Sequence, residues 1–140
     1  MIRHQLSIFV ENEPGVLARV ARALAEGGVN LRAISVSDNA DDAVLRIVVD
    51  DERKATHILE QTGALCVTRE IVEVDLPDAP GALAGIAALL AAKNINISYA
   101  YGSAGGNGHG GKASLYLRIP GPQAAEADAA IQAHLAKHGG

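Results

Sequence analysis

The chain has 140 residues, 49% of them hydrophobic and 3% aromatic, and a formal net charge of −4. This composition supplies enough apolar side chains for a packed core and therefore argues against a disordered chain. A negative net charge without any basic cluster argues against nucleic acid as a partner.

The first half of the chain predicts the order strand, helix, strand, strand, helix, strand. Residues 5–10 alternate polar and apolar side chains, which is typical of a half-buried strand. Pro14 stands in the first turn of an amphipathic helix, and Gly27 and Gly28 end that helix. The remaining elements are strands over 29–37 and 43–49, a helix over 52–61 and a strand that begins over 65–67.

The second half repeats this plan but stops one element short. It predicts strands over 71–76, 95–101 and 114–119, with helices over 81–93 and 123–137. No segment remains for a fourth strand of its own. Residues 66–76 are nearly unbroken strand composition, so no linker separates the halves, and we expect domains over residues 1–69 and 70–140.

A six-residue motif occurs once in each half. Residues 12–17 read Asn-Glu-Pro-Gly-Val-Leu, and residues 78–83 read Asp-Ala-Pro-Gly-Ala-Leu. Asn30 and Asn96 follow these motifs at matching distances, each between apolar neighbours. A repeat in matching register indicates two copies of one structural unit.

The glycines of the two motifs allow a ligand to approach the backbone closely, and the free amides at a helix start favour a carboxylate. Asn12 and Asp78 could accept hydrogen bonds from an α-ammonium group, but bracing the turn or capping the helix explains them equally well. We expect Asn30 and Asn96, flanked by inward-facing residues, to need a polar partner.

The paired pattern of strand, Asn/Asp-x-Pro-Gly-[Val/Ala]-Leu-Ala, helix and Asn-bearing strand resembles the ACT domain, present in tandem. The resemblance implies an α+β fold of two ferredoxin-like βαββαβ units, with antiparallel sheets, helices on one face, and a second unit lacking its last strand. In ACT domains that bind amino acids, residues at these positions contribute from opposite partners across an interface. This pairs Asn12 with Asn96 and Asp78 with Asn30. The candidate ligand-binding residues are Asn12, Gly15, Val16, Leu17, Asn30, Asp78, Gly81, Ala82, Leu83 and Asn96.

Two further patterns are interpreted as structural. Residues 106–111 fit G-x-G-x-x-G, but a strand follows Lys112 where a phosphate loop needs a helix, so we expect a flexible hairpin loop. His134 and His138 have the spacing of a metal pair, but no cysteine or acidic triad accompanies them, and we interpret them as a solvated helix face. We therefore expect no metal, no cofactor and no catalytic residues.

The single cysteine and the apolar runs bear on the compartment. Cys66 cannot form an internal disulfide, which fits a reducing compartment, and we interpret it as a small buried hydrophobic residue. The N-terminus carries no apolar signal segment, and residues 81–92, the longest uncharged apolar run, are too short to span a bilayer. We therefore expect a cytoplasmic protein without a membrane partner.

These observations favour a non-catalytic sensor or regulatory protein that binds a small amino acid at the interface between its ACT units. The alternative is a structural or regulatory subunit that associates with a metabolic enzyme and binds no ligand. Residues 81–92 contain no charged or polar side chain, and a helix apolar on every face is usually covered on every face. We therefore expect a homodimer buried mainly through the second unit.

Overall fold

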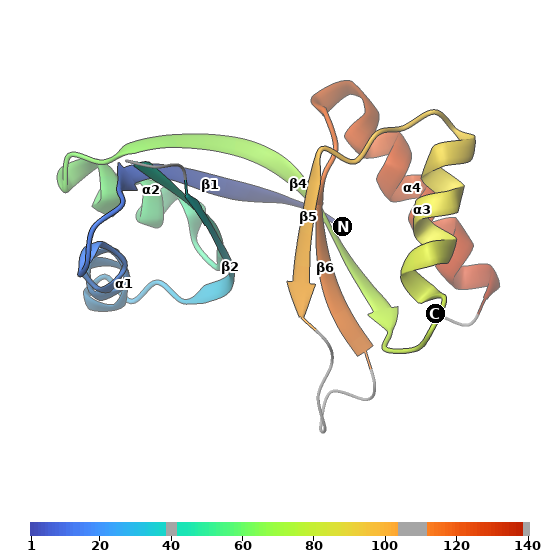
Figure 1. The fold of residues 1–140 in the computed structure, drawn as a ribbon, viewed down its shortest axis with the longest axis horizontal. Coiled ribbons are helices and arrows are strands. Elements are labelled where there is room, and N and C mark those ends of the chain that lie inside the picture. The colour runs from blue at the N-terminus through green and yellow to red at the C-terminus, as the bar shows by residue number, and fades with distance from the viewer. Residues whose placement is uncertain (39–41, 104–111, 139–140) are drawn as a thin grey trace. The chain divides into compact units, whose positions relative to one another are not determined.

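The computed structural model describes residues 1–38, 42–103 and 112–138. These residues form two compact units. The N-terminal unit comprises residues 4–69, and the C-terminal unit comprises residues 1–3 together with residues from 70 onward. In each unit two helices cover one face of an antiparallel sheet (Figure 1). The predicted α+β fold of ferredoxin-like units is thereby confirmed.

The N-terminal unit follows the order predicted from the sequence. Its strands hydrogen-bond in the order β2-β3-β1-β4, so β2 is an edge strand. Strand β3 pairs antiparallel with both β1 and β2. The elements are β1 (Ile2–Glu11), α1 (Val16–Glu26), β2 (Leu31–Asp38), β3 (Asp42–Val49), α2 (Glu52–Gln61) and β4 (Leu65–Pro77).

One continuous apolar cluster holds the N-terminal unit together. Leu6 and Ile8 on β1 face Leu24 of α1 and Leu59 of α2, and all four side chains are almost fully buried. Leu45 and Ile47 lie opposite the β1 pair on β3 and complete the same face. Alternation along the strands and helical spacing along α1 and α2 therefore meet in one core, as the sequence pattern predicts.

The C-terminal unit uses the second part of β4 as its first strand. Strands β4, β6 and β5 pair antiparallel in that order, so β5 is an edge strand. Helices α3 and α4 contribute Ile86, Leu90 and Ile131 to a core that also contains Val74 and Leu117. The elements beyond β4 are α3 (Ala82–Ala92), β5 (Tyr99–Ser103), β6 (Lys112–Arg118) and α4 (Gly121–Lys137).

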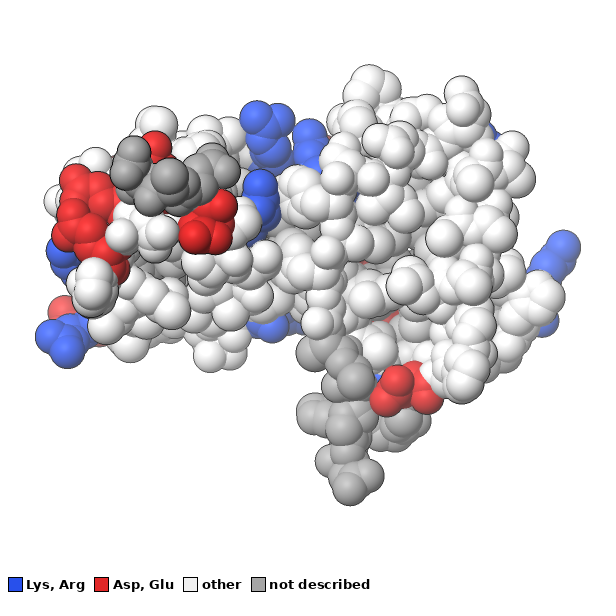
Figure 2. All heavy atoms as spheres, viewed as in Figure 1, with Lys and Arg blue, Asp and Glu red and all other residues white. Residues whose placement is uncertain are grey.

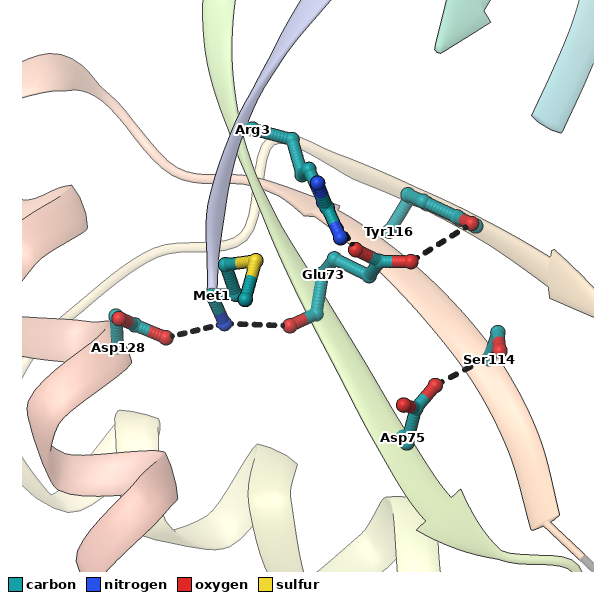
Figure 3. Close-up of polar contacts among 7 residues, drawn as sticks. All are labelled: Met1, Arg3, Glu73, Asp75, Ser114, Tyr116 and Asp128. Atoms are coloured by element: carbon teal, nitrogen blue, oxygen red, sulfur yellow. Dashed lines mark hydrogen bonds and ion pairs between the residues drawn. The ribbon is translucent and has the colours of Figure 1, made fainter. Parts of the chain in front are cut away.

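The place of a fourth strand in the C-terminal unit is taken by residues 1–3, from the other end of the sequence. The Glu73 amide donates to the Met1 carbonyl, and the Met1 amino group donates to the Glu73 carbonyl, both at 2.8 Å. The amino group also donates to Asp128 Oδ1 at 2.7 Å (Figure 3). The repeat in the sequence shows that a strand is missing but gives no sign of this source.

Side chains reinforce the same contact. The Arg3 guanidinium donates to Glu73 Oε2, and the Tyr116 hydroxyl donates to Glu73 Oε1 at 3.1 Å (Figure 3). The Glu73 side chain is only 10% exposed, so little solvent screens this carboxylate. Glu73 thus joins β1, β4 and β6 through both its backbone and its side chain.

The strand predicted over residues 95–101 is wrong in its bounds, since β5 begins only at Tyr99. The reason lies at the end of α3. Asn94 adopts a left-handed φ of 56°, and the Ile95 amide returns to the Leu90 carbonyl at 2.9 Å. This helix-terminating turn uses residues that the alternation of apolar side chains assigns to the strand.

Replacing Glu73 with alanine should lower the free energy of unfolding by about 1.5–3 kcal/mol, because both Arg3 and Tyr116 lose a charge-assisted partner. Asp75 supplies the matched control. Its exposed carboxylate lies on the same strand and, among the described residues, accepts one exposed hydrogen bond, from Ser114 Oγ at 2.8 Å. Asp75→Ala should therefore cost less than about 1 kcal/mol. Urea denaturation measures both, and equal losses would contradict the role assigned to Glu73.

Candidate functional site

The two Pro-Gly turns have the same backbone conformation. Gly15 has φ 88° and ψ −11°, Gly81 has φ 89° and ψ −12°, and each immediately precedes its helix. A side chain at these φ values is strained. A Cβ built on either glycine would meet no atom of the described residues within 4 Å, so the conformation, not crowding, requires glycine. The turns are therefore open on their outer side.

Neither helix start is capped by a side chain, and neither first turn contains an acidic residue. The helix-capping role considered for Asn12 and Asp78 is therefore not observed. Asn12 Nδ2 instead donates to Asp38 Oδ2 at 3.5 Å, which braces the first turn against the end of β2. Asp78 is exposed.

The first helical turns also leave amides available. In the N-terminal unit the Val16 and Arg19 amides donate to backbone carbonyls, and in the C-terminal unit the Ala82 and Gly85 amides do so. Within the described residues, the amides of Leu17 and Ala18 in the first helix have no backbone acceptor, and neither do those of Leu83 and Ala84 in the second. Each turn thus offers unpaired N–H donors beside an exposed glycine, which is an arrangement that suits a carboxylate.

Asn30 and Asn96 do not lie in inward-facing positions, so the reason given for their needing a partner is wrong. Both are exposed, and both precede their edge strands, since β2 begins at Leu31 and β5 at Tyr99. The Asn30 backbone is fixed by Asp50, because its amide donates to Asp50 Oδ1 at 3.0 Å. Exposure leaves both side-chain amides accessible to a ligand.

Within the N-terminal unit, Asn12 and Asn30 lie toward opposite ends of β2. Asn12 contacts Asp38 at the end of the strand, and Asn30 immediately precedes its start. At about 3.3 Å per residue, the length of β2 separates these ends by roughly 25 Å. One small ligand therefore cannot contact both side chains of the same unit.

The apolar candidates divide into buried and exposed positions. Val16 is 5% exposed and belongs to the interior, and Ala82 is half-buried. Leu17 and Leu83, which occupy equivalent positions in the repeat, are 47% and 53% exposed. These two leucines are available to a ligand or a partner, whereas Val16 is not.

A cavity of about 270 Å³ lies beside the second turn, entirely within the C-terminal unit. Gly81 and Ala82 line it, together with His134 and His138 from the end of α4. The interpretation of the two histidines as a solvated helix face is therefore wrong for His134, which is half-buried. The spacing of the two histidines could have marked them as a functional pair. However, the sequence gives no indication that α4 ends beside the second turn.

A second and more polar cavity, of about 370 Å³, lies in the N-terminal unit along α2. His4 and Glu52 are among its lining residues and form an ion pair with Nδ1 and Oε2 3.1 Å apart when the imidazole is protonated. Within the described residues there is no group of three or more histidine, cysteine or acidic side chains that could hold a metal ion.

Residues 106–111, for which the sequence predicts a flexible hairpin loop, lie outside the described residues. The element that follows them is strand β6, beginning at Lys112, as expected. In the part of the chain that the structure describes, no helix is both long and apolar enough to cross a membrane.

The charges around the two turns differ. Glu11 and Glu13 flank Asn12 at the first turn, and their mutual hydrogen bond and repulsion raise the pKa of Glu13. The matching positions at the second turn are Pro77 and Ala79. On the face drawn in Figure 2, acidic side chains gather mainly over the N-terminal unit. The first turn thus carries two carboxylates, Glu11 and Glu13, with Arg19 nearby, whereas the second turn carries one, Asp78.

Comparison with protein families places nearly the whole chain in one match. A model described as an ACT domain pair matches residues 1–127. Among curated proteins, a probable acetolactate synthase small subunit of Archaeoglobus fulgidus is 30% identical over 76 residues, covering 52% of this chain and 48% of the relative. The acetolactate synthase small subunit of Mycobacterium avium is 36% identical over 75 residues, covering 51% and 45%. The matched segment thus spans about half the length of these relatives.

Solved structures agree with the family match. A protein of Bacteroides thetaiotaomicron superposes with a TM-score of 0.86 at 30% identity, over 96% of this chain and 89% of that one. The ligand-free regulatory subunit of aspartate kinase from Thermus thermophilus superposes with a TM-score of 0.69 at 22% identity, over 92% and 90%. The second likeness shows a shared fold.

Cys66 should react slowly with iodoacetamide at neutral pH. Burial, and secondarily the negative charge of Glu60, raise the pKa of this half-buried thiol, so less of it is the reactive thiolate than in an exposed cysteine. Alkylation followed by mass spectrometry should show slow modification in the native protein and rapid modification in urea. Equal rates in both states would contradict this assignment.

Proposed function

The chain belongs to the family of ACT domain pairs, and from this premise we propose that it is a non-catalytic regulatory protein that binds a small amino acid. The observation that carries the proposal is the pair of identical Pro-Gly turns, each with an exposed glycine and unpaired amides at a helix start. The amides suit the ligand carboxylate. Exposed Asn12, Asp78, Asn30 and Asn96 offer oxygen atoms to its ammonium group.

The strand order of each unit supports a ligand site made by two copies of the chain. In each unit the strand that follows the asparagine, β2 or β5, is an edge strand. Strands β1 and β4 contribute to both units, and in the strand order of each unit they lie on the side away from that edge strand. We therefore propose that the β2 edge of one copy pairs with the β5 edge of another. An unpaired strand edge is a ready site for such pairing.

Antiparallel pairing of these edges also resolves the separation between Asn12 and Asn30. It brings the end of β2 in one copy beside the start of β5 in the other. Asn12 then meets the partner's Asn96, and Asp78 meets the partner's Asn30, as the family resemblance implies. Binding at this seam would change the free energy of the dimer, which is how a protein without catalytic residues can transmit a signal.

Exposed apolar side chains support the same interface. Leu17 of α1 and Ile34 and Val36 of β2 are 47%, 42% and 53% exposed. Helix α3 presents Leu83 and a series of exposed alanines, and it contains no polar side chain. Covering these surfaces in a homodimer would remove apolar area from water.

The curated relatives are named as small subunits of acetolactate synthase. By that likeness we propose that a cytoplasmic metabolic enzyme is the regulated partner. The same names favour the alternative function, in which the chain associates with such an enzyme and binds no amino acid. A ligand screen separates the two functions.

Screening the twenty amino acids by thermal shift should identify one that raises the melting temperature, because ligand binds only the folded protein. Asn30→Ala and Asn96→Ala should each weaken that ligand by about tenfold or more, since each removes a hydrogen bond to a charged group. Gln132→Ala, an exposed change on α4, should leave its affinity unaltered. Failure of all twenty amino acids to stabilise the protein would favour the ligand-free alternative.

Light scattering at tens of micromolar should report a dimer. Ala84→Glu and Ala88→Glu place a charge on the exposed apolar face of α3 and should increase the dimer dissociation constant by about tenfold or more. Gln132→Glu adds the same charge on α4 and should not. A monomer at these concentrations would exclude the proposed interface.

A further inference from the structure

We propose that the C-terminal unit has a second ligand site, for a small carboxylate with a short aliphatic tail, in the cavity between the start of α3 and the end of α4. This site lies within one unit and needs no second copy of the chain. It shares Gly81 and Ala82 with the second Pro-Gly turn of the proposed amino-acid site, and the two histidines and the variants described below distinguish the two sites.

The size and walls of the cavity indicate the size and polarity of its ligand. Its volume is about 270 Å³, which suits a molecule of a few carbon atoms. Leu76, Ile86 and Leu135 contribute apolar side chains to the wall. Among the described residues no acidic side chain lines the cavity, so an ammonium group would enter without a carboxylate partner. An aliphatic tail is therefore favoured over a second charged group.

Two imidazoles supply the polar groups of the site. The rings of His134 and His138 lie with their centroids 4.5 Å apart and tilted by 42°. Within the described residues, neither ring makes a hydrogen bond or an ion pair. A neutral imidazole carries one N–H donor and a protonated one carries two, and either can donate to a carboxylate. Convergent donors in an otherwise apolar cavity are the usual form of a small-molecule site.

Small residues on α3 keep the cavity open. The position that matches Ala82 in the first repeat is Val16, which is 5% exposed, and the position that matches Gly85 is Arg19. Glycine inside a helix is less favourable than alanine. A Cβ at Gly85 would lie 3.4 Å from His134 Nε2, on the side where that nitrogen faces α3. Glycine here thus leaves the imidazole edge uncovered at the cost of helix stability.

The length of α4 completes the site. Helix α4 has 17 residues, whereas its counterpart α2 has 10. His134 and Leu135 lie in the last turns of α4, and His138 immediately follows the helix, which extends to the start of α3. The cavity is therefore built from features in which the second repeat departs from the first: a longer helix and two smaller side chains.

The test uses the tag-free full chain, labelled with ¹⁵N and titrated with 3-methylbutanoate or with 3-methylbutylamine. The two probes share an aliphatic tail and differ in the sign of their charge. The carboxylate should shift the amide resonances of Gly81 and Gly85 and the ring resonances of His134 in a saturable way, whereas the amine should not. Equal shifts with both probes, or no saturable shift up to about 10 mM, would overturn the proposal.

Variants locate the binding. His134→Gln and His138→Gln should each weaken 3-methylbutanoate by about threefold or more, because each removes one imidazole donor. His57→Gln, outside the cavity, is the matched control and should not. Gly85→Ala should weaken binding while leaving the helix intact. If a histidine variant fails to fold, the affinity of Gly85→Ala still tests the site. Affinities unchanged in all three cavity variants would overturn the site.

One further variant distinguishes the two sites. Asn30→Ala should leave 3-methylbutanoate binding unchanged, since Asn30 does not line this cavity. If that variant weakens the carboxylate as much as it weakens the amino acid, the two ligands share one site and the present inference fails. If the amino-acid screen finds nothing while the carboxylate binds through His134, the inference stands and the proposed function fails.

Discussion

The C-terminal unit depends on the hydrogen bonds between Met1 and Glu73. They place residues 1–3 beside β4, where a complete ferredoxin-like unit has its fourth strand. Without them the backbone groups along that side of β4 would face solvent as an open edge. The buried Glu73 carboxylate, held by Arg3 and Tyr116, adds side-chain pairing to the backbone pairing. The rest of the unit, including the core between α3 and α4, is built on the sheet that this contact closes.

Most of the fold follows from periodicity in the sequence. Alternation in β1 and helical spacing in α1 predict one buried cluster, and Leu6, Ile8 and Leu24 lie in it. What periodicity cannot give is a pairing between distant segments. Residues 1–3 carry no signal that marks them as a strand of the other repeat, because any short strand can fill an open edge. The start of β5 was misplaced for a local reason, since the turn at Asn94 outweighs the apolar alternation of residues 95–97.

The candidate site was only partly predictable, for a similar reason. The left-handed glycines follow directly from the repeated Pro-Gly motif, and Gly15 and Gly81 have nearly the same φ and ψ. The exposure of Asn30 and Asn96 could not be obtained from their apolar neighbours, because it depends on where each edge strand begins. The position of His134 depends on how two helices pack and on the length of α4, neither of which the spacing of two histidines reveals.

The pairing of residues 1–3 with Glu73 has a consequence for how the chain is made. These residues are synthesised before the atoms they bind, which lie about seventy positions later, with a separation of 72 between Met1 and Glu73. The N-terminal unit has all its residues from 4 to 69 before that partner exists. Residues 1–3 must therefore stay without this partner while that unit is translated, and the sheet of the C-terminal unit closes late, since such distant contacts form slowly.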